Sequence, residues 1–385
     1  MMFKLTIKPL MLLVLSLFTL NLQANALIPA APQIAARSYV VMDADTGRII
    51  AAKNEDKQFP PASLTKLMTS YVLAYELAKG NISKSDLVLV SEKAWRTQGS
   101  RMFIKEGTQV QLSDLMKGIV IQSGNDASVA VAEHIAGSET AFADLMNQHA
   151  DLLGMTNSNF LNATGLPKAG HASSAIDMAQ LGRAIIQQYP EHYGIYSEKY
   201  FTYNNIRQPN RNRLLWRDKT VDGLKTGHTE EAGYCLVASA KREGMRLISV
   251  VMGARSEESR AVESQKLLSY GFRYFRTHKL YDAGETLNSA TVWSGVRDQV
   301  SLGLANELAV TIPRGQVDQL QAVMDIDRVI KAPVIKGQVY GKVNIHLNGE
   351  QVEEVPLVAL NDVAEAGLLI RIWHSIMLFF LNLIG

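Results

Sequence analysis

The sequence contains little cysteine and no cluster of metal ligands. Among its 385 residues there is one cysteine, Cys235, so no disulfide can form within the chain. Cys235 stands in an apolar, strand-like stretch, where a small core side chain is expected. No group of cysteines and histidines has the spacing of metal ligands. We therefore expect neither a metal site nor a cofactor.

An excess of charge of one sign is also missing. Two of the 39 basic residues lie within residues 1–26, which hold no acidic residue, so 37 basic and 37 acidic residues remain. This balance argues against broad nucleic-acid binding. Hydrophobic residues make up 47% of the chain, which excludes a disordered protein and allows two packed domains.

The N-terminus has the pattern of a secretory signal peptide. Lys4 and Lys8 precede an apolar run over 10–22, and Ala24-Asn25-Ala26 follows it. This pattern predicts cleavage after Ala26 and a mature chain that works outside the cytoplasm.

Ser63 and Lys66 stand at the start of a segment whose apolar residues recur with helical period. Three residues apart on a helix, they share one face, and an amine kept neutral there could take the proton of the hydroxyl. The backbone N–H of Ser63, free at a helix start, could stabilise an oxyanion. Taken alone, the same pattern also fits a capping serine and a solvated lysine.

The periodicity indicates an α+β catalytic domain over 27–280. We expect one antiparallel sheet with helices on its faces, a helical lobe inserted between its hairpins, and the active site in the cleft between lobe and sheet. Strands are predicted at 38–43, 48–53, 223–227, 234–242 and 245–253, and helices from about 63 and at 113–121, 126–135 and 257–275.

The remaining chain is predicted to form two smaller parts. Short alternating segments over 281–365, with a hairpin at 343–347 and 351–358, indicate an all-β domain for spacing or binding. Residues 366–385 are almost wholly apolar, with a narrow polar stripe of Arg371, His374, Ser375 and Asn382. This stripe favours an amphipathic helix lying in a membrane interface, with a spanning helix as the alternative.

Three polar motifs stand in chain order. They are Ser63-Leu64-Thr65-Lys66, Ser123-Gly124-Asn125 and Lys225-Thr226-Gly227. Together they resemble the set found in penicillin-binding proteins and class A β-lactamases, with Gly124 where that set has aspartate. With His228-Thr229 after the third motif, the chain resembles low-molecular-mass penicillin-binding proteins of the D-alanyl-D-alanine carboxypeptidase type. Stretches at 162–166, 170–171, 210–212 and 214–216 are similar to that family too.

The resemblance implies a role for each motif residue. Ser63 would be the nucleophile and Lys66 its base, Ser123 would relay a proton to the departing amine, and Asn125 would bind the substrate amide and orient Lys66. The third motif would bind the rest of the substrate: Lys225 and Thr226 its terminal carboxylate, Gly227 its closely approaching backbone, and the N–H of His228 the oxyanion.

Four further residues are open between two roles. Arg260 matches a family arginine thought to hold the carboxylate, but it could be a surface charge, and Arg211 is a similar candidate. His171 and Asp177 are expected to clamp a loop rather than to take part in catalysis.

The resemblance implies a periplasmic enzyme, peripheral on the inner membrane, that trims peptidoglycan stem peptides and is acylated by β-lactams. Its expected partners are those peptides, β-lactams and membrane lipid, with no nucleic acid. The alternatives are a serine β-lactamase and a murein-binding scaffold with an idle serine. Class A β-lactamases use a glutamate between the second and third motifs for deacylation, and residues 156–177 contain none.

Overall fold

A five-stranded antiparallel sheet is the centre of the catalytic part of the chain. The computed structural model describes residues 28–384, so the predicted signal peptide lies outside the described residues. The sheet has the order β2-β1-β9-β8-β7. Its strands are β1 (Ser38–Asp43), β2 (Ile49–Lys53), β7 (Val221–Thr229), β8 (Gly233–Arg242) and β9 (Met245–Ala254). The N-terminal hairpin thus pairs with the three later strands through β1 and β9, as the sequence predicts.

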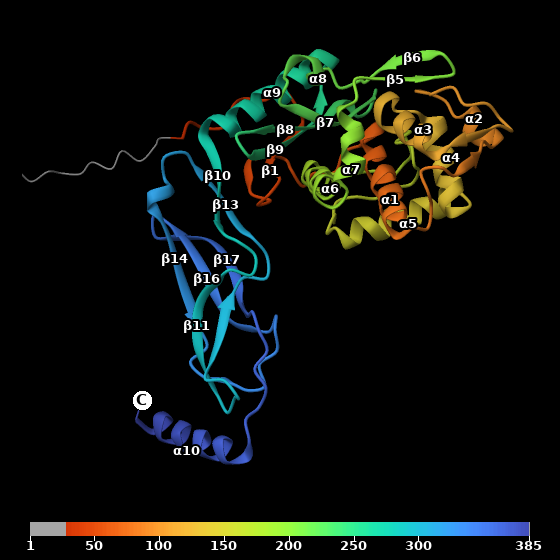
Figure 1. Ribbon diagram of the computed structural model, residues 1–385. Coiled ribbons are helices and arrows are strands. Elements are labelled where there is room, and N and C mark those ends of the chain that lie inside the picture. Colours follow the sequence, from red (N-terminus) through yellow and green to blue (C-terminus); the bar gives the residue numbers. More distant parts are fainter. Residues whose placement is uncertain (1–27, 385) are drawn as a thin grey trace, which may run out of the picture.

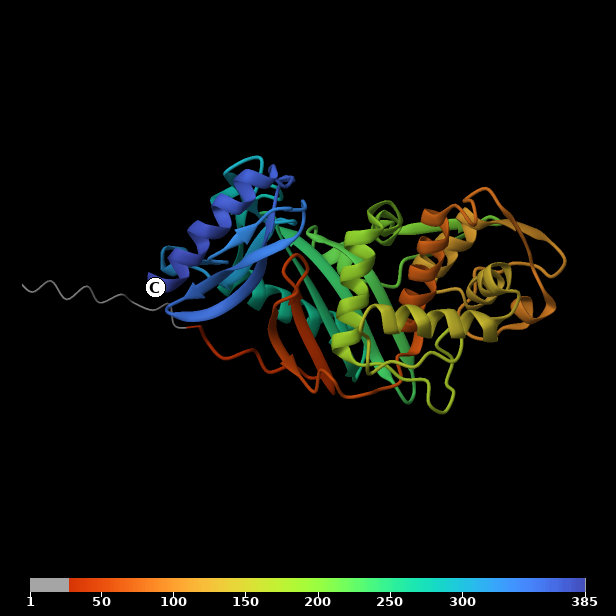
Figure 2. The same cartoon turned by 90° about the horizontal axis from the view of Figure 1, so that it is seen from below.

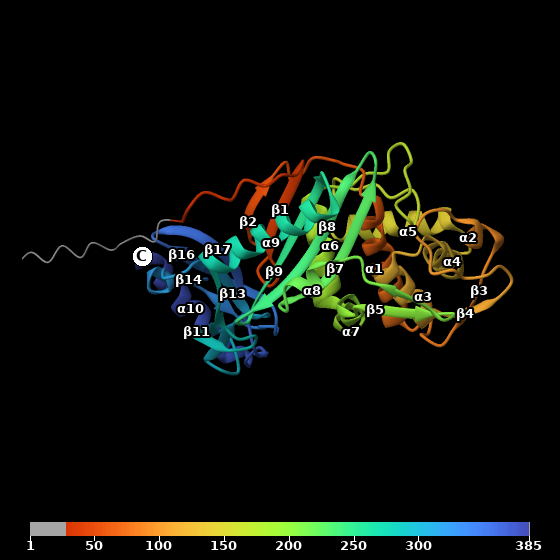
Figure 3. The same ribbon diagram turned by 90° about the horizontal axis from the view of Figure 1, so that it is seen from above.

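Helices cover both faces of this sheet (Figures 1 and 3). Helix α9 (Glu257–Tyr274) packs on one face, and α6 (Ala175–Gln188) covers the other beside the helical lobe. The α+β architecture is therefore confirmed. The other helices of this part are α1 (Thr65–Lys79), α2 (Glu92–Arg96), α3 (Leu112–Lys117), α4 (Asn125–Ala136), α5 (Glu139–Leu152), α7 (Pro190–Tyr193) and α8 (Leu214–Arg217). Two small two-stranded antiparallel sheets accompany them: β3 (Leu87–Leu89) with β4 (Gln109–Gln111), and the hairpin of β5 (Tyr200–Tyr203) with β6 (Ile206–Pro209).

Helix α1 runs through the middle of the lobe. Its residues 65–74 are all buried, because the lobe packs around the whole helix rather than along one stripe. The α-helix begins at Thr65, two residues after the predicted start, and Ser63 lies in a 3₁₀ turn, Ala62–Leu64, that leads into it. Similarly, the helix predicted at 113–121 is α3 followed by a π-helical turn, Gly118–Gln122.

The C-terminal part is all-β up to its last helix. The hairpin expected around Asn348-Gly349 is present, with both residues at positive φ, as a tight two-residue turn requires. Residues 275–281, for which no strand was predicted, form β10, which pairs with β13. A six-stranded group has the order β14-β16-β17-β12-β11-β15. The strands are β10 (Phe275–Tyr281), β11 (Thr286–Trp293), β12 (Gln299–Gly303), β13 (Leu308–Pro313), β14 (Leu320–Ile326), β15 (Ile330–Lys331), β16 (Val339–Leu347) and β17 (Glu350–Ala359).

Helix α10 (Leu368–Ile384) lies at the end of the β-strands farthest from the catalytic part (Figures 1 and 2). Two residues of the predicted polar stripe contact segments next to these strands: His374 Nδ1 accepts from the N–H of Ser294 at 2.7 Å, and Arg371 pairs with Glu365 at 2.6 Å. The side chain of Asn382 lies outside the described residues. No helix within residues 28–384 is long and apolar enough to cross a bilayer.

The turn that carries Ser63 is packed tightly against the loop at 162–166. Gly165 has φ +81°, and a Cβ there would overlap the carbonyl oxygen of Ala62. Only glycine therefore fits at this position, and it sets how closely the loop approaches the turn.

We expect Gly165→Ala to lower the free energy of unfolding by about 3 kcal/mol, because a strained φ and a steric overlap add together. Gly154→Ala is the matched control, since Gly154 also has positive φ (+69°) but open space around it. The control should cost only about 1 kcal/mol. Urea denaturation of both variants measures the difference, and equal losses would contradict the packing argument.

Candidate active site

Lys66 joins the turn, the lobe and the loop at one point. Its Nζ lies 3.2 Å from Ser63 Oγ, 2.6 Å from Asn125 Oδ1 and 2.5 Å from the carbonyl oxygen of Thr164. The side chain is only 1% exposed. Burial, and next the charge of Arg211, lower the pKa of Lys66 to about 7. A neutral amine one hydrogen bond from a serine hydroxyl can act as its base.

The second motif is held between the π-helical turn and α4. Ser123 has φ +66°, and its Oγ accepts from Lys225 Nζ at 2.9 Å. Asn125 donates to the carbonyl oxygen of Gln98 at 2.6 Å while it accepts from Lys66, so both ends of its amide are engaged. A Cβ on Gly124 would lie 2.9 Å from Asp126 Oδ1 and 3.3 Å from the carbonyl oxygen of Gly118, so a side chain there would crowd these atoms.

Asp126, for which no role was predicted, supports the second motif from α4's first turn by holding a neighbouring loop. It is fully buried, and its carboxylate accepts from the N–H groups of Met102, Phe103 and Ile104. These bonds fix the loop that lies over the second motif.

The third motif lies on β7, at the free edge of the sheet. Lys225 is buried, and burial, followed by the charge of Lys66, lowers its pKa well below the usual range. The structure gives a reason for glycine at position 227 other than the predicted close approach of the substrate backbone. A Cβ there would lie 3.0 Å from the carbonyl oxygen of Pro61 and 3.2 Å from the N of Leu64. The glycine therefore lets the strand approach the turn that carries Ser63.

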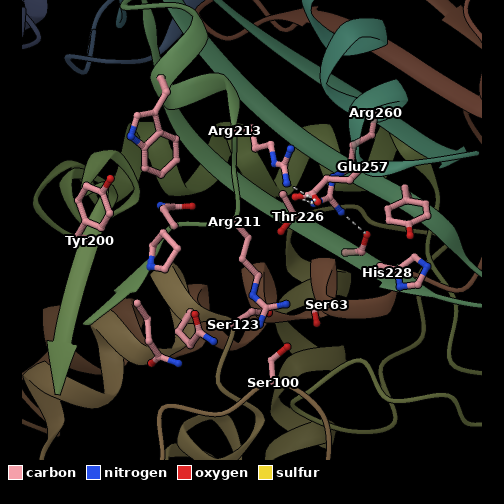
Figure 4. A pocket seen from close by; sticks show the side chains of 17 residues that line it. Ser63, Ser100, Ser123, Tyr200, Arg211, Arg213, Thr226, His228, Glu257 and Arg260 are labelled. Atoms are coloured by element: carbon pink, nitrogen blue, oxygen red, sulfur yellow. Dashed lines mark hydrogen bonds and ion pairs between the residues drawn. The ribbon is translucent and has the colours of Figure 1, made fainter. Parts of the chain in front are cut away.

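The motifs line a cavity of about 770 Å³. Figure 4 shows Ser63, Ser123, Thr226 and His228 around it. The predicted residues Ser63, Ser123, Thr226, Gly227, His228 and Arg260 are among its walls, and Lys66, Asn125 and Lys225 lie behind them.

Arg260 and Arg211 both belong to this cavity. Arg260 is buried and donates to the carbonyl oxygen of Gly227 at 3.1 Å, so it is not a surface charge. Arg211 lines the wall, between Asn210 and Asn212, whose side chains are buried. Asn212 donates to the carbonyl oxygen of Gly223 at 2.9 Å, which ties this turn to β7.

His171 and Asp177 have the contacts of loop clamps. His171 Nε2 lies 2.8 Å from Thr65 Oγ1, and its Nδ1 accepts from the N–H of Leu161. Asp177 accepts from the N–H of Asn157 and the hydroxyl of Ser158, at 2.9 and 2.7 Å. Neither residue lines the cavity.

Part of the cavity wall was not predicted. The stretches around Arg211 and Trp216 resemble the family, but no role was predicted for Trp216. Nothing in the sequence of the β5–β6 hairpin indicated that it would line the site. The cavity residues without a predicted role are Ser100, Gln122, Tyr200, Gln208, Pro209, Asn210, Arg213, Trp216, Tyr234 and Glu257. Within residues 28–384 no group of three or more histidine, cysteine, aspartate or glutamate residues could hold a metal ion.

Comparison with known proteins agrees with this geometry. A family model described as D-alanyl-D-alanine carboxypeptidase matches residues 25–256. The chain belongs to the D-alanyl-D-alanine carboxypeptidase family. A second model, the C-terminal domain of penicillin-binding protein 5, matches residues 275–365. Members of this carboxypeptidase family are serine-type hydrolases and penicillin-binding proteins of low molecular mass, and the chain is one of them.

Individual relatives cover nearly the whole chain. D-alanyl-D-alanine carboxypeptidase DacC of Escherichia coli (strain K12) is 46% identical, over 91% of this chain and 90% of its own length. DacA of Haemophilus influenzae is 45% identical, over 94% of each. Among solved structures, penicillin-binding protein 5 from Haemophilus influenzae matches with a TM-score of 0.84 and 46% identity, over 88% of this chain and all of that one. These matches favour a carboxypeptidase over a β-lactamase or an idle scaffold.

The pKa of Lys66 predicts how acylation of this carboxypeptidase depends on pH. Lys66 is protonated below about pH 7 and neutral above it. The second-order rate constant for acylation by a penicillin should therefore rise by about tenfold per pH unit below that value and level off above it. Stopped-flow or quench measurements across the range check this.

The control is Lys66→Arg, which keeps a cation but has no neutral form in this range. It should acylate at least about a hundredfold more slowly and show no plateau. A wild-type rate that does not change with pH would remove Lys66 as the base.

Proposed function

We propose that this chain removes the terminal D-alanine from peptidoglycan stem pentapeptides through an acyl-enzyme on Ser63. The observation that carries the proposal is the buried Lys66 amine, 3.2 Å from Ser63 Oγ and with its pKa lowered to about 7. A lysine in this state supplies the base that a serine hydroxyl lacks.

Acylation follows from the positions of four groups. Ser63 Oγ attacks the carbonyl carbon of the penultimate residue while its proton moves to Lys66. The N–H groups of Ser63 and His228 stabilise the negative oxygen that forms. Ser123 Oγ passes a proton to the departing nitrogen and regains one from Lys66, so that the proton of Ser63 ends on the amine as the C–N bond breaks and D-alanine leaves.

Substrate orientation comes from β7. The strand has a free edge, so a peptide can add to it as a further antiparallel strand. Thr226 would hydrogen-bond the terminal carboxylate, with Arg211, Arg260 and the buried Lys225 supplying positive charge around it. Asn125 holds Lys66 in place at 2.6 Å.

Deacylation needs a water molecule and a base. Asp177, the one acid in residues 156–177, is buried and engaged with Asn157 and Ser158, so it cannot serve. Lys66 is then the base near the ester. A peptide acyl group leaves the carbonyl open once D-alanine has diffused away, whereas the opened ring of a penicillin stays tethered and hinders the water.

We therefore expect penicillin hydrolysis to be slower than turnover of diacyl-L-Lys-D-Ala-D-Ala by at least about a hundredfold, or about 3 kcal/mol in the barrier. Intact-protein mass spectrometry should show a penicilloyl adduct lasting minutes, and Ser63→Ala should fold and show none. Equal turnover of penicillin and peptide would move the protein to the β-lactamases, and an adduct on Ser63→Ala would exclude Ser63 as nucleophile.

We also propose that residues 1–26 direct export and that the enzyme works on the periplasmic face of the inner membrane. In this organisation 27–274 form the catalytic domain, 275–365 a β domain that begins with β10 and acts as a spacer, and 366–385 the membrane anchor. The exposed apolar side of α10 supports the anchor, with Leu369 at 83% and Phe379 at 63% exposure, while Arg371 and His374 contact Glu365 and Ser294 of the β domain.

Deletion of 366–385 should release an active, soluble enzyme. Apolar burial dominates the binding of such a helix, so high salt should extract the full-length protein from membranes only partly. Fractionation with a penicillin-labelling assay measures both effects. If the truncated protein still sedimented with membranes, the anchor would have to lie elsewhere.

A further inference from the structure

Glu139, the first residue of α5, holds the loop that binds the Lys66 amine. Its Oε1 atom accepts from the N–H of Ala163 at 3.1 Å. The carbonyl oxygen of Ala163 accepts from Thr69 Oγ1, on α1, at 2.7 Å. Ala163 is thus fixed on both sides of its backbone, and the next residue, Thr164, supplies the carbonyl that accepts from Lys66.

The other carboxylate oxygen of Glu139 faces a cation on a different helix. Lys93, on α2, pairs with Oε2 at 2.8 Å, and the side chain of Glu139 is only 15% exposed. Glu139 also stands in the first turn of α5, where the helix dipole favours a negative charge. These contacts keep the carboxylate in one orientation between α2 and the loop.

Glu139 lies outside the substrate cavity. Together with Thr164 and Gln98 it lines a second cavity, of about 480 Å³, none of whose described lining residues belongs to the cavity around Ser63. Gln98 is the residue whose carbonyl oxygen accepts from Asn125. The second cavity is therefore bordered by residues that hold the base, and a carboxylate placed there acts on the reaction without contact to the substrate.

The charge of Glu139 acts on the same amine as its hydrogen bond does. Two basic and two acidic groups, each from a different segment, act on Lys66: Arg211, Lys225, Asp126 and Glu139. The basic groups favour the neutral amine, and the acids favour the protonated one. His171 is close as well, but burial lowers its pKa to about 4, so it is neutral where Lys66 titrates. Asp126 is engaged with three backbone N–H groups of another loop, so of the two acids Glu139 is the one that also holds a partner of the amine.

We propose that Glu139 is a positioning residue for the reaction of Ser63. Its carboxylate fixes the loop that holds the Lys66 amine, and its negative charge raises the pH at which that amine becomes available as a base. The inference rests on the proposed function, because that function assigns the base to Lys66.

Glu139→Gln separates the charge from the hydrogen bond. The amide oxygen can still accept from Ala163, but the negative charge is gone. Lys66 then loses a group that favours its protonated form, so the neutral amine forms at lower pH. We expect acylation of the full chain by a penicillin at about pH 6, relative to the plateau at high pH, to be about threefold faster than in the wild type. The plateau itself should stay within about twofold. Quench measurements of the second-order rate constant against pH give both values.

Glu139→Ala removes the hydrogen bond as well. The N–H of Ala163 is then unpaired, and the loop holds the Thr164 carbonyl less firmly. The plateau should fall by about tenfold, because the base is less well placed, whereas glutamine at this position should keep it.

Two control variants test whether the effect belongs to this carboxylate. Glu133→Gln changes a glutamate of the same lobe that accepts from Ser91 Oγ at 2.6 Å and is not among the groups that act on Lys66, so the profile should be unchanged. Lys93→Gln breaks the ion pair but leaves the carboxylate charged. It should therefore not speed acylation at about pH 6 relative to the plateau.

The outcomes separate the two proposals. A wild-type rate that does not change with pH would remove Lys66 as the base and overturn the proposed function. A wild-type rate that rises with pH, together with a Glu139→Gln profile that coincides with it, would overturn the inference alone. A gain at low pH that Lys93→Gln reproduces would do the same, since loss of the ion pair would then be the cause. A wild-type plateau in Glu139→Ala would also overturn it, because the loop would not need this carboxylate.

Discussion

The burial of Lys66 is the constraint on which the rest of the site depends. An amine taken out of water favours its neutral form, but it still needs polar neighbours at hydrogen-bond distance. Ser63 Oγ, Asn125 Oδ1 and the Thr164 carbonyl supply them from three separate segments of the chain. The proposed catalytic base therefore has its polar neighbours only when turn, lobe and loop are assembled, which ties the proposed chemistry to the tertiary fold.

Close backbone packing makes that assembly possible. Gly165 lets the loop that supplies the Thr164 carbonyl approach Ala62, and Gly227 lets β7 approach Pro61 and Leu64. The two glycines therefore contact the same 3₁₀ turn, Gly165 from the loop and Gly227 from β7. They fix the position of Ser63 by excluding side chains, where hydrogen bonds alone would leave more freedom.

The sequence predicted those features that depend on local pattern. Strands β1, β8 and β9 alternate or run apolar over their length, so their ranges were correct within a residue or two. The motif residues could be named because three polar clusters occur at element boundaries in a recognisable order. The tight contact of Gly227 with Pro61 could not be foreseen, since it joins segments more than 150 residues apart in the chain. For the same reason Gln208 gave no signal: its burial is a property of the assembled cavity alone.

The charges of the site favour the binding of an acidic ligand. Burial lowers the pKa of both Lys66 and Lys225. The charges of neighbouring cations, among them Arg211, lower both values further. Within the cavity wall Glu257 is the one acid, and it is paired with Arg213 at 3.1 Å and with Arg260 at 3.4 Å. A substrate carboxylate that enters beside Thr226 would meet more positive than negative charge, because three arginines and this one acid line the cavity, and its presence would favour the protonated form of Lys225. Lys66 contacts Ser63 instead, and under the proposed function it stays neutral to act as the base. The two lysines, alike in burial, thus differ in the serine that each contacts, which is Ser63 for Lys66 and Ser123 for Lys225.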